Sequence, residues 1–175
     1  MKKVLLATLI LLFFATAVFA DVKIGFIDSN RLENEYNEYK TVKSEFDRLV
    51  SAWQDSAQAM EDEITNLQQE YQTQHYMLSD EKKQETEKII QDKLTAYQNF
   101  RLNTFGTGGL AEKKYAEMTA PLLENIQTAL EEIAEEYGYT LILDRSSGSI
   151  GYIDESLDVT DILLEKLNKG TESGK

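Results

Sequence analysis

The sequence of 175 residues has no cysteine, one histidine and one proline. The lack of cysteine excludes disulfides, thiol catalysis and cysteine-based metal sites. We interpret the single histidine, His75, as a polar position on a long helix. Because Pro121 is the one proline and the glycines gather in a few places, most of the chain has nothing to interrupt a helix. The sequence therefore predicts a mainly helical protein that is not an enzyme, without catalytic, cofactor-binding or metal-binding residues.

Basic residues are also scarce, with 18 Lys and Arg against 31 Asp and Glu and a formal net charge of −13. Two of the lysines lie in residues 1–20, which hold no acidic residue, so the rest of the chain carries 16 basic against 31 acidic groups, or −15. A surface this acidic repels nucleic acid and anionic lipid. We therefore expect no nucleic-acid partner, and the charge disfavours membrane contact.

Residues 1–20 have the pattern of a secretory signal peptide: two lysines, an apolar run from Val4 to Phe14, and small residues at Val18 and Ala20. The apolar run is short for a membrane span. We expect export across the inner membrane into the periplasm, with cleavage after Ala20.

A long amphipathic helix is indicated by apolar residues that recur from residue 32 to residue 78. Between Phe46 and Tyr71, seven apolar steps cover 25 residues, about 3.6 residues a step, which is the helical period. Ser79 can cap a second helix, in which Ile90 and Leu94 begin a new apolar stripe. Two such helices joined by a tight polar turn form an antiparallel hairpin of coiled-coil type.

A glycine cluster, Gly106, Gly108 and Gly109, interrupts the return helix in the stretch "NFRLNTFGTGGLAEKKY". A phosphate-binding loop would need a preceding strand and a GK[ST] ending, whereas here a helix precedes and the lysines come late. Glycine inside a helix costs roughly 1 kcal/mol relative to alanine. We therefore interpret the three glycines as a hinge between the arm and the rest of the protein.

Three short strands are predicted at the two ends of the chain, over 21–28, 139–144 and 150–154, the last two forming a β-hairpin around Gly148. A helix ending at Gly138 precedes the hairpin, and a final helix capped by Asp158 or Thr160 follows it. So small a strand set cannot bury itself within one chain, which favours self-association. The predicted interface residues are Val22, Ile24, Phe26, Leu141, Leu143, Ile150 and Tyr152.

Two segments hold acidic residues of the kind that metal sites or catalytic sites use. The segment 154–161, "DESLDVTD", lacks the ligand spacing and the glycine of an EF-hand loop, so helix capping explains its acids. The turn at Asp144, Arg145 and Ser146 has no second activated group beside it, and we interpret it as turn chemistry.

Three segments, "VKIGFIDSNRLENEY", "PLLENIQTALEEIAEEYGYTLILD" and "GYIDESLDVTDILLEKLN", resemble the opening, the body helix and the closing segment of the Skp/OmpH family of periplasmic chaperones. The order of elements matches over nearly the whole chain after the signal. The resemblance implies a homotrimer with helical arms around a cavity, acting as an ATP-independent holdase for unfolded outer-membrane proteins. The acidic charge and the glycine cluster depart from the better-known members.

Nine aromatic residues on the predicted arm are more than one helical seam needs, so some are expected to touch client chains. Which of them face the cavity stays open. The candidates for client contact are Trp53, Tyr71, Tyr76, Tyr97 and Phe100.

The sequence thus predicts an α+β, mainly α, fold: a long antiparallel helical-hairpin arm on a small β-containing trimerisation body. The predicted ranges are 1–20 for the signal, 21–30 and 111–170 for the body, 31–110 for the arm and 171–175 for a disordered tail. The alternative function is a structural coiled-coil protein of the cell envelope without client binding. A hydrolase or metal enzyme is a more distant alternative. Client identity and, from physics alone, the number of subunits stay open.

Overall fold

The structure is a computed structural model that describes residues 22–148 and 150–173. The predicted signal peptide lies outside these residues. The elements in chain order are β1 (Ile24–Ile27), α2 (Ser29–Glu35), α3 (Asn37–Gln74), the 3-10 turn η1 (His75–Met77), α4 (Asp80–Phe105), α5 (Leu110–Tyr137), β2 (Leu141–Asp144), the 3-10 turns η2 (Arg145–Ser147) and η3 (Glu155–Leu157), and α6 (Thr160–Ser173).

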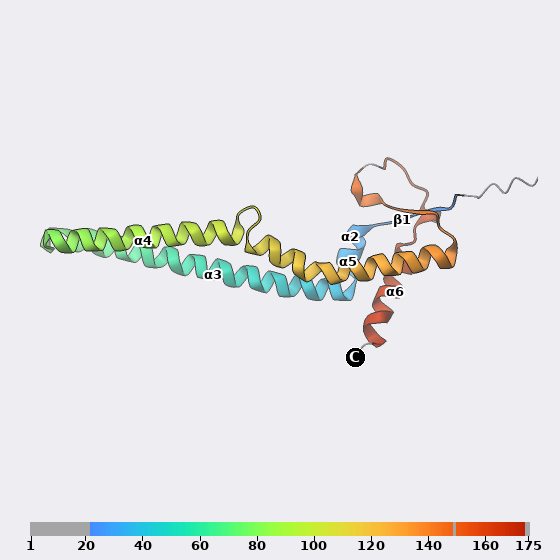
Figure 1. Cartoon of the computed structure of the whole chain (residues 1–175), viewed down its shortest axis with the longest axis horizontal. Helices are drawn as coiled ribbons and strands as arrows, with labels where there is room; N and C mark the ends of the chain where they lie inside the picture. Colours follow the sequence, from blue (N-terminus) through green and yellow to red (C-terminus); the bar gives the residue numbers. More distant parts are fainter. Residues whose placement is uncertain (1–21, 149, 174–175) are drawn as a thin grey trace, which may run out of the picture.

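A long helical hairpin projects from one side of a small body (Figure 1). Helices α3 and α4 form the hairpin, and α5 continues from α4 towards the body alongside the first part of α3. Ser79 accepts a hydrogen bond from the Lys82 amide, at 3.4 Å, and so caps α4. The predicted hairpin and its cap are confirmed.

The hydrophobic core lies in the body, where α2, α5, α6 and the start of α3 meet. Amphipathic helices bury their apolar stripes by packing against one another. Here α2, α5 and α6 contribute buried side chains to one cluster, and α3 contributes half-buried ones. Its buried members are Ile27, Leu32, Tyr36, Leu122, Ala129, Ile133, Val159, Leu163, Leu164 and Leu167. The body therefore extends through α2 to Tyr36, beyond the predicted boundary at residue 30.

The strands β1 and β2 pair in parallel, with Ile24 opposite Leu141 and Ile27 opposite Asp144. Parallel pairing needs a long crossover, and the arm together with α5 supplies it. Gly138 ends α5 in the left-handed conformation, with φ of 74°, as the sequence predicts.

The predicted third strand at residues 150–154 is wrong, because these residues carry no strand in the described part of the chain. Local side-chain hydrogen bonds compete with a sheet ladder here: Asp144 accepts from the Ser146 amide and Asp154 from the Ser156 amide, each at 2.9 Å. The chain instead returns to β1 at Val159, whose amide donates to the Phe26 carbonyl at 2.9 Å.

Two further boundaries differ from the prediction. The helix expected to run unbroken from residue 30 to residue 78 stops at Glu35 and restarts at Asn37, with Tyr36 in an extended conformation between them. At the other end, α6 continues to Ser173, into the segment predicted to be disordered, and residues 174–175 lie outside the described chain. Among the described residues, no helix combines the length and the apolar character needed to cross a bilayer.

Candidate interaction surfaces

The exposed side of the sheet carries apolar side chains that the single chain does not cover. Ile24 and its strand partner Leu141 are exposed, as are Val22 and Leu143, and Tyr152 is 85% exposed. Ile150 is half-buried. Ile24, Leu141 and Leu143 lie on the sheet itself, Val22 precedes β1 and Tyr152 lies in the loop after β2. Exposed apolar side chains on one side of a sheet mark a surface for association.

Phe26 differs from the other predicted interface residues because it is buried within the single chain. The segment after β2 covers it: the Arg145 guanidinium lies 5.5 Å from the centre of the Phe26 ring, and Asp158 forms a β-bridge with the Phe26 backbone. Its position in the strand alternation indicated the outer face, but the returning loop places it in the interior.

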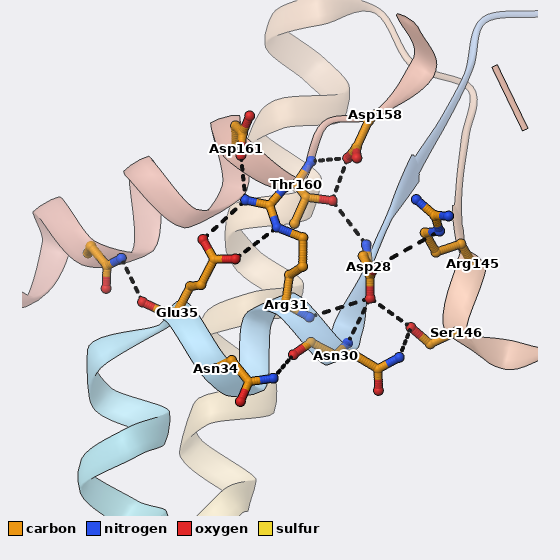
Figure 2. A network of polar contacts seen from close by, with 11 residues as sticks. Asp28, Asn30, Arg31, Asn34, Glu35, Arg145, Ser146, Asp158, Thr160 and Asp161 are labelled. Atoms are coloured by element: carbon orange, nitrogen blue, oxygen red, sulfur yellow. Dashed lines mark hydrogen bonds and ion pairs between the residues drawn. The ribbon is translucent and has the colours of Figure 1, made fainter. Parts of the chain in front are cut away.

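A polar network closes the body at the carboxyl end of β1 (Figure 2). The Asp28 carboxylate accepts hydrogen bonds from the Asn30 and Arg31 amides, at 3.0 and 3.4 Å, and from the Ser146 hydroxyl at 3.1 Å. The Asp28 amide donates to the Thr160 hydroxyl at 3.0 Å. This network connects the start of α2 to η2 and to the start of α6. Asp28 acts in it as the N-cap of α2.

Asp144 serves the same purpose at the end of β2. Its carboxylate accepts hydrogen bonds from the Ser29 hydroxyl at 2.7 Å, the Ser29 amide at 3.3 Å and the Ser146 amide at 2.9 Å. Partial burial alone would raise the pKa of Asp144, but the hydrogen bonds from Ser29 and Ser146 outweigh it and hold the pKa below the usual value. An ionised, fully engaged carboxylate is a structural acceptor and not a proton donor.

The acidic stretch 154–161 also has a structural use. Asp154 caps η3, and Asp158 accepts from the Thr160 amide at 2.8 Å and from the Thr160 hydroxyl. Within residues 22–148 and 150–173 there is no cluster of histidine and acidic side chains that could hold a metal ion.

The two helices of the arm meet along a seam of mostly half-buried side chains, to which polar contacts are added. Ile64 and Thr104 are the buried side chains of α3 and α4 in the described arm. Lys93 pairs with Glu63 at 2.8 Å, and the Tyr97 hydroxyl donates to Glu61 at 3.2 Å. Near the tip, the Tyr71 hydroxyl donates to Glu87, and this hydrogen bond raises the Tyr71 pKa to about 12. Outside this seam, most side chains of the arm are exposed.

Four of the five aromatic candidates for client contact are half-buried, namely Trp53, Tyr71, Tyr97 and Phe100. Tyr71 and Tyr97 also join the two helices through their hydroxyl groups. Tyr76 lies in η1 at the tip and is 94% exposed, and its neighbour Met77 is 84% exposed. The sequence did not single out Met77.

The glycine cluster forms a compact loop between α4 and α5, whereas α3 runs unbroken beside both helices. Gly108 has φ of 69°, and its amide donates to the Glu112 carboxylate at 2.7 Å. A Cβ on Gly106 would lie 2.4 Å from the Leu102 carbonyl oxygen, and one on Gly109 would lie 2.7 Å from that of Gly106. All three glycines are therefore needed for the shape of this loop, and its role as a hinge stays a prediction.

Residues that the sequence analysis missed lie where the arm meets the body. Tyr36 is 1% exposed, and its hydroxyl donates a hydrogen bond to the Glu38 carboxylate. The same carboxylate accepts a hydrogen bond from the side-chain amide of Asn125 at 3.4 Å. Burial, with the Glu38 contact, raises the Tyr36 pKa to about 12. Asn168 on α6 contacts the backbone on both sides of Tyr36. Nothing in the local sequence signals these contacts, since Asn168 lies more than 130 positions from its partners.

These features define a long helical hairpin on a small α+β body with an uncovered apolar sheet face. A family model described as outer membrane protein (OmpH-like) matches residues 23–167, and the chain belongs to this family. A comparison with curated proteins gave no match. The fold is similar to the crystal structure of a proposed outer membrane chaperone (OmpH-like) from Caulobacter crescentus, with a TM-score of 0.73, 12% identity and 85% of each chain covered.

Proposed function

We propose that the protein is an ATP-independent holdase chaperone of the periplasm, which binds unfolded outer-membrane proteins and keeps them soluble. The observation that carries the proposal is the arm, a two-helix hairpin that presents apolar side chains to solvent: Tyr76 and Met77 at the tip are 94% and 84% exposed, and Leu102 on α4 is 68% exposed. A helix pair needed only for rigidity has no use for apolar side chains in solvent. Membership of the OmpH-like family and the fold of the Caulobacter crescentus protein support the same function.

The working form that we propose is a homotrimer assembled through the exposed sheet face. Ile24, Leu141, Leu143 and Tyr152 offer apolar surface that a neighbouring copy would cover. In the described chain β2 has one unpaired edge, whereas the outer edge of β1 is bridged by Asp158 at Phe26. The number three comes from the family resemblance. Several arms around one client would replace a specific pocket by many weak contacts, so that avidity supplies the affinity.

The test is light scattering during dilution of a denatured outer-membrane β-barrel protein into buffer without nucleotide. The protein from Asp21 onward should suppress the aggregation and form a soluble complex. Deletion of residues 60–97, with Ala59 joined to Gln98 by a short turn, removes the outer arm but leaves the body core intact. This shortened protein should assemble normally and lose most of its protection.

A control variant keeps the arm at full length and changes only the tip, with Tyr76→Ser and Met77→Ser. If contacts spread along the arm carry the binding, this variant should keep most of the protection. A shortened protein that protects as well as the full-length one would show that the arm is not the client site. The alternative, a structural coiled-coil protein of the envelope, would then be favoured.

A further inference from the structure

Two helices, α3 and α5, join the arm to the body. Each lacks one or more helical hydrogen bonds near this junction. On one side the chain leaves the helical conformation at Tyr36, between α2 and α3. On the other side Pro121 lies inside α5 and has no amide hydrogen to donate to the Glu117 carbonyl. Glu38 and Asn125 are in contact at 3.4 Å. Tyr36 lies two residues from Glu38 towards the body and Pro121 four residues from Asn125 towards the tip, so the two points are about 9 Å apart along the arm at 1.5 Å per residue.

The break at Tyr36 removes three backbone hydrogen bonds, those from the Asn37, Glu38 and Tyr39 amides to carbonyls of α2, whereas the Tyr36 amide still donates to the Leu32 carbonyl. The side-chain amide of Asn168, on α6, bonds one group on each side of the break. Its oxygen accepts from the Asn37 amide at 3.0 Å, and its nitrogen donates to the Glu35 carbonyl at 3.3 Å. One side-chain amide from the body thus replaces part of the backbone hydrogen bonding that the break removes.

We infer that Tyr36 and Pro121 form an elbow between body and arm, and that Asn168 is the positioning residue that sets its angle. Tyr36 anchors the elbow, because its ring is buried in the same cluster as Leu122, the neighbour of Pro121, and Leu167 of α6. When the Asn168 amide loses these contacts, α3 can turn about Tyr36 while α5 bends at Pro121, where one helical hydrogen bond is already absent. The position of α6 then controls the direction of the arm.

The test measures the angle directly and does not depend on client binding. The chain has no cysteine, so Gln54→Cys on α3 and Glu135→Cys on the body half of α5 place two spin labels at exposed positions. Labelled chains diluted with unlabelled ones report the distance within one chain. Asn168→Leu keeps the bulk of the side chain and removes both hydrogen bonds. Because one intramolecular hydrogen bond shifts an equilibrium by about fivefold, the population outside the main distance peak should rise at least that much.

Three variants control the result. Asn168→Asp keeps the acceptor for the Asn37 amide and loses the donor to Glu35, so its distribution should be intermediate. Asn34→Ala removes an amide whose bond, to the Asn30 carbonyl at 2.7 Å, lies within α2, and it should leave the distribution unchanged. Pro121→Ala restores the missing amide of α5 and should narrow the distribution.

Circular dichroism shows whether each variant keeps its helices. A wild-type distribution in folded Asn168→Leu would overturn the inference, and so would equal broadening in Asn34→Ala. If the leucine variant does not fold, Asn168→Asp decides alone, and a wild-type distribution there rejects the role of Asn168. An unchanged distribution in Pro121→Ala would reject the half of the elbow that lies in α5.

Discussion

At the scale of single residues, the acidic side chains of the body act as caps, and their charge is part of the cap. Asp28, Asp144, Asp154 and Asp158 each accept a backbone amide at the start of a helix or turn. Carboxylates in such positions are stabilised as anions by the amide dipoles. Hydrogen bonds hold the pKa of Asp144 and of Asp154 below the usual value, so the stability of the body should depend on pH through these two groups.

Asp144→Asn keeps the shape of the side chain and removes its charge. Because the folded pKa lies below the unfolded one, the charged form stabilises the protein above the ordinary carboxyl pKa, and this contribution is lost as the pH falls through the folded value. We expect the variant to be less stable than wild type by about 1–2 kcal/mol at pH 7. Urea unfolding between pH 7 and pH 3 should show this difference shrinking towards zero.

The control for this titration is Asp55→Asn, a change of the same charge on the exposed surface of α3. Its stability difference from wild type should be small at every pH. A difference for Asp144→Asn that persists unchanged at pH 3 would mean that geometry, and not charge, makes the cap.

At the scale of elements, the glycine loop between α4 and α5 is a shaped connection. Gly106→Ala should lower the free energy of unfolding by about 1–3 kcal/mol, because the new Cβ would lie 2.4 Å from a backbone oxygen and the loop must shift. Gly151→Ala is the matched control, since a Cβ there meets nothing within 4 Å. Thermal unfolding of both variants measures the contrast, and equal effects would contradict a loop that requires its glycines.

The elements that the sequence predicts well are those that local signals determine. The seam from Phe46 to Tyr71, the cap at Ser79 and the end of α5 at Gly138 each follow from neighbours within a few residues. The break at Tyr36 could not be predicted, because its apolar side chain continues the helical period and the group that compensates for the break, Asn168, comes from the other end of the chain.

The exposure of the predicted interface residues could be inferred only in part. Strand alternation groups Ile24, Leu141 and Leu143, and all three are exposed in the single chain, whereas their role in assembly stays a prediction. The same alternation placed Phe26 with them, but alternation cannot show that a distant loop covers one end of a strand. Likewise the sequence identifies the aromatic residues of the arm by type but not by place. Tyr71 and Tyr97 bridge the two helices, and Tyr76 is exposed at the tip. This difference depends on the pairing of α3 with α4.

At the scale of the whole molecule, the uncovered sheet face determines whether the protein works as one chain or several. Leu143 is 39% exposed in the single chain, so Leu143→Asp places a solvated charge there and should leave the helical content unchanged. In the proposed trimer the same aspartate would be buried without a partner, which costs several kcal/mol. We expect analytical ultracentrifugation to show dissociation of this variant at micromolar concentration.

Leu123→Asp provides the comparison, because Leu123 is 61% exposed on α5, outside the sheet. This variant should sediment as wild type does. A wild-type protein that sediments as a folded single chain would contradict assembly through the sheet face, and so would dissociation caused equally by both substitutions.

The parallel pairing of β1 with β2 has a consequence for how such proteins can diverge. Ile24 lies opposite Leu141, 117 positions further along the chain, so the arm is an insertion between two neighbouring strands. Its length is then independent of the body: each turn added to both α3 and α4 extends the hairpin by about 5.4 Å and leaves every core contact unchanged. For the proposed function, this means that selection can adjust the reach of the arm to the size of a client by insertions and deletions in matched pairs, without a change in the body core.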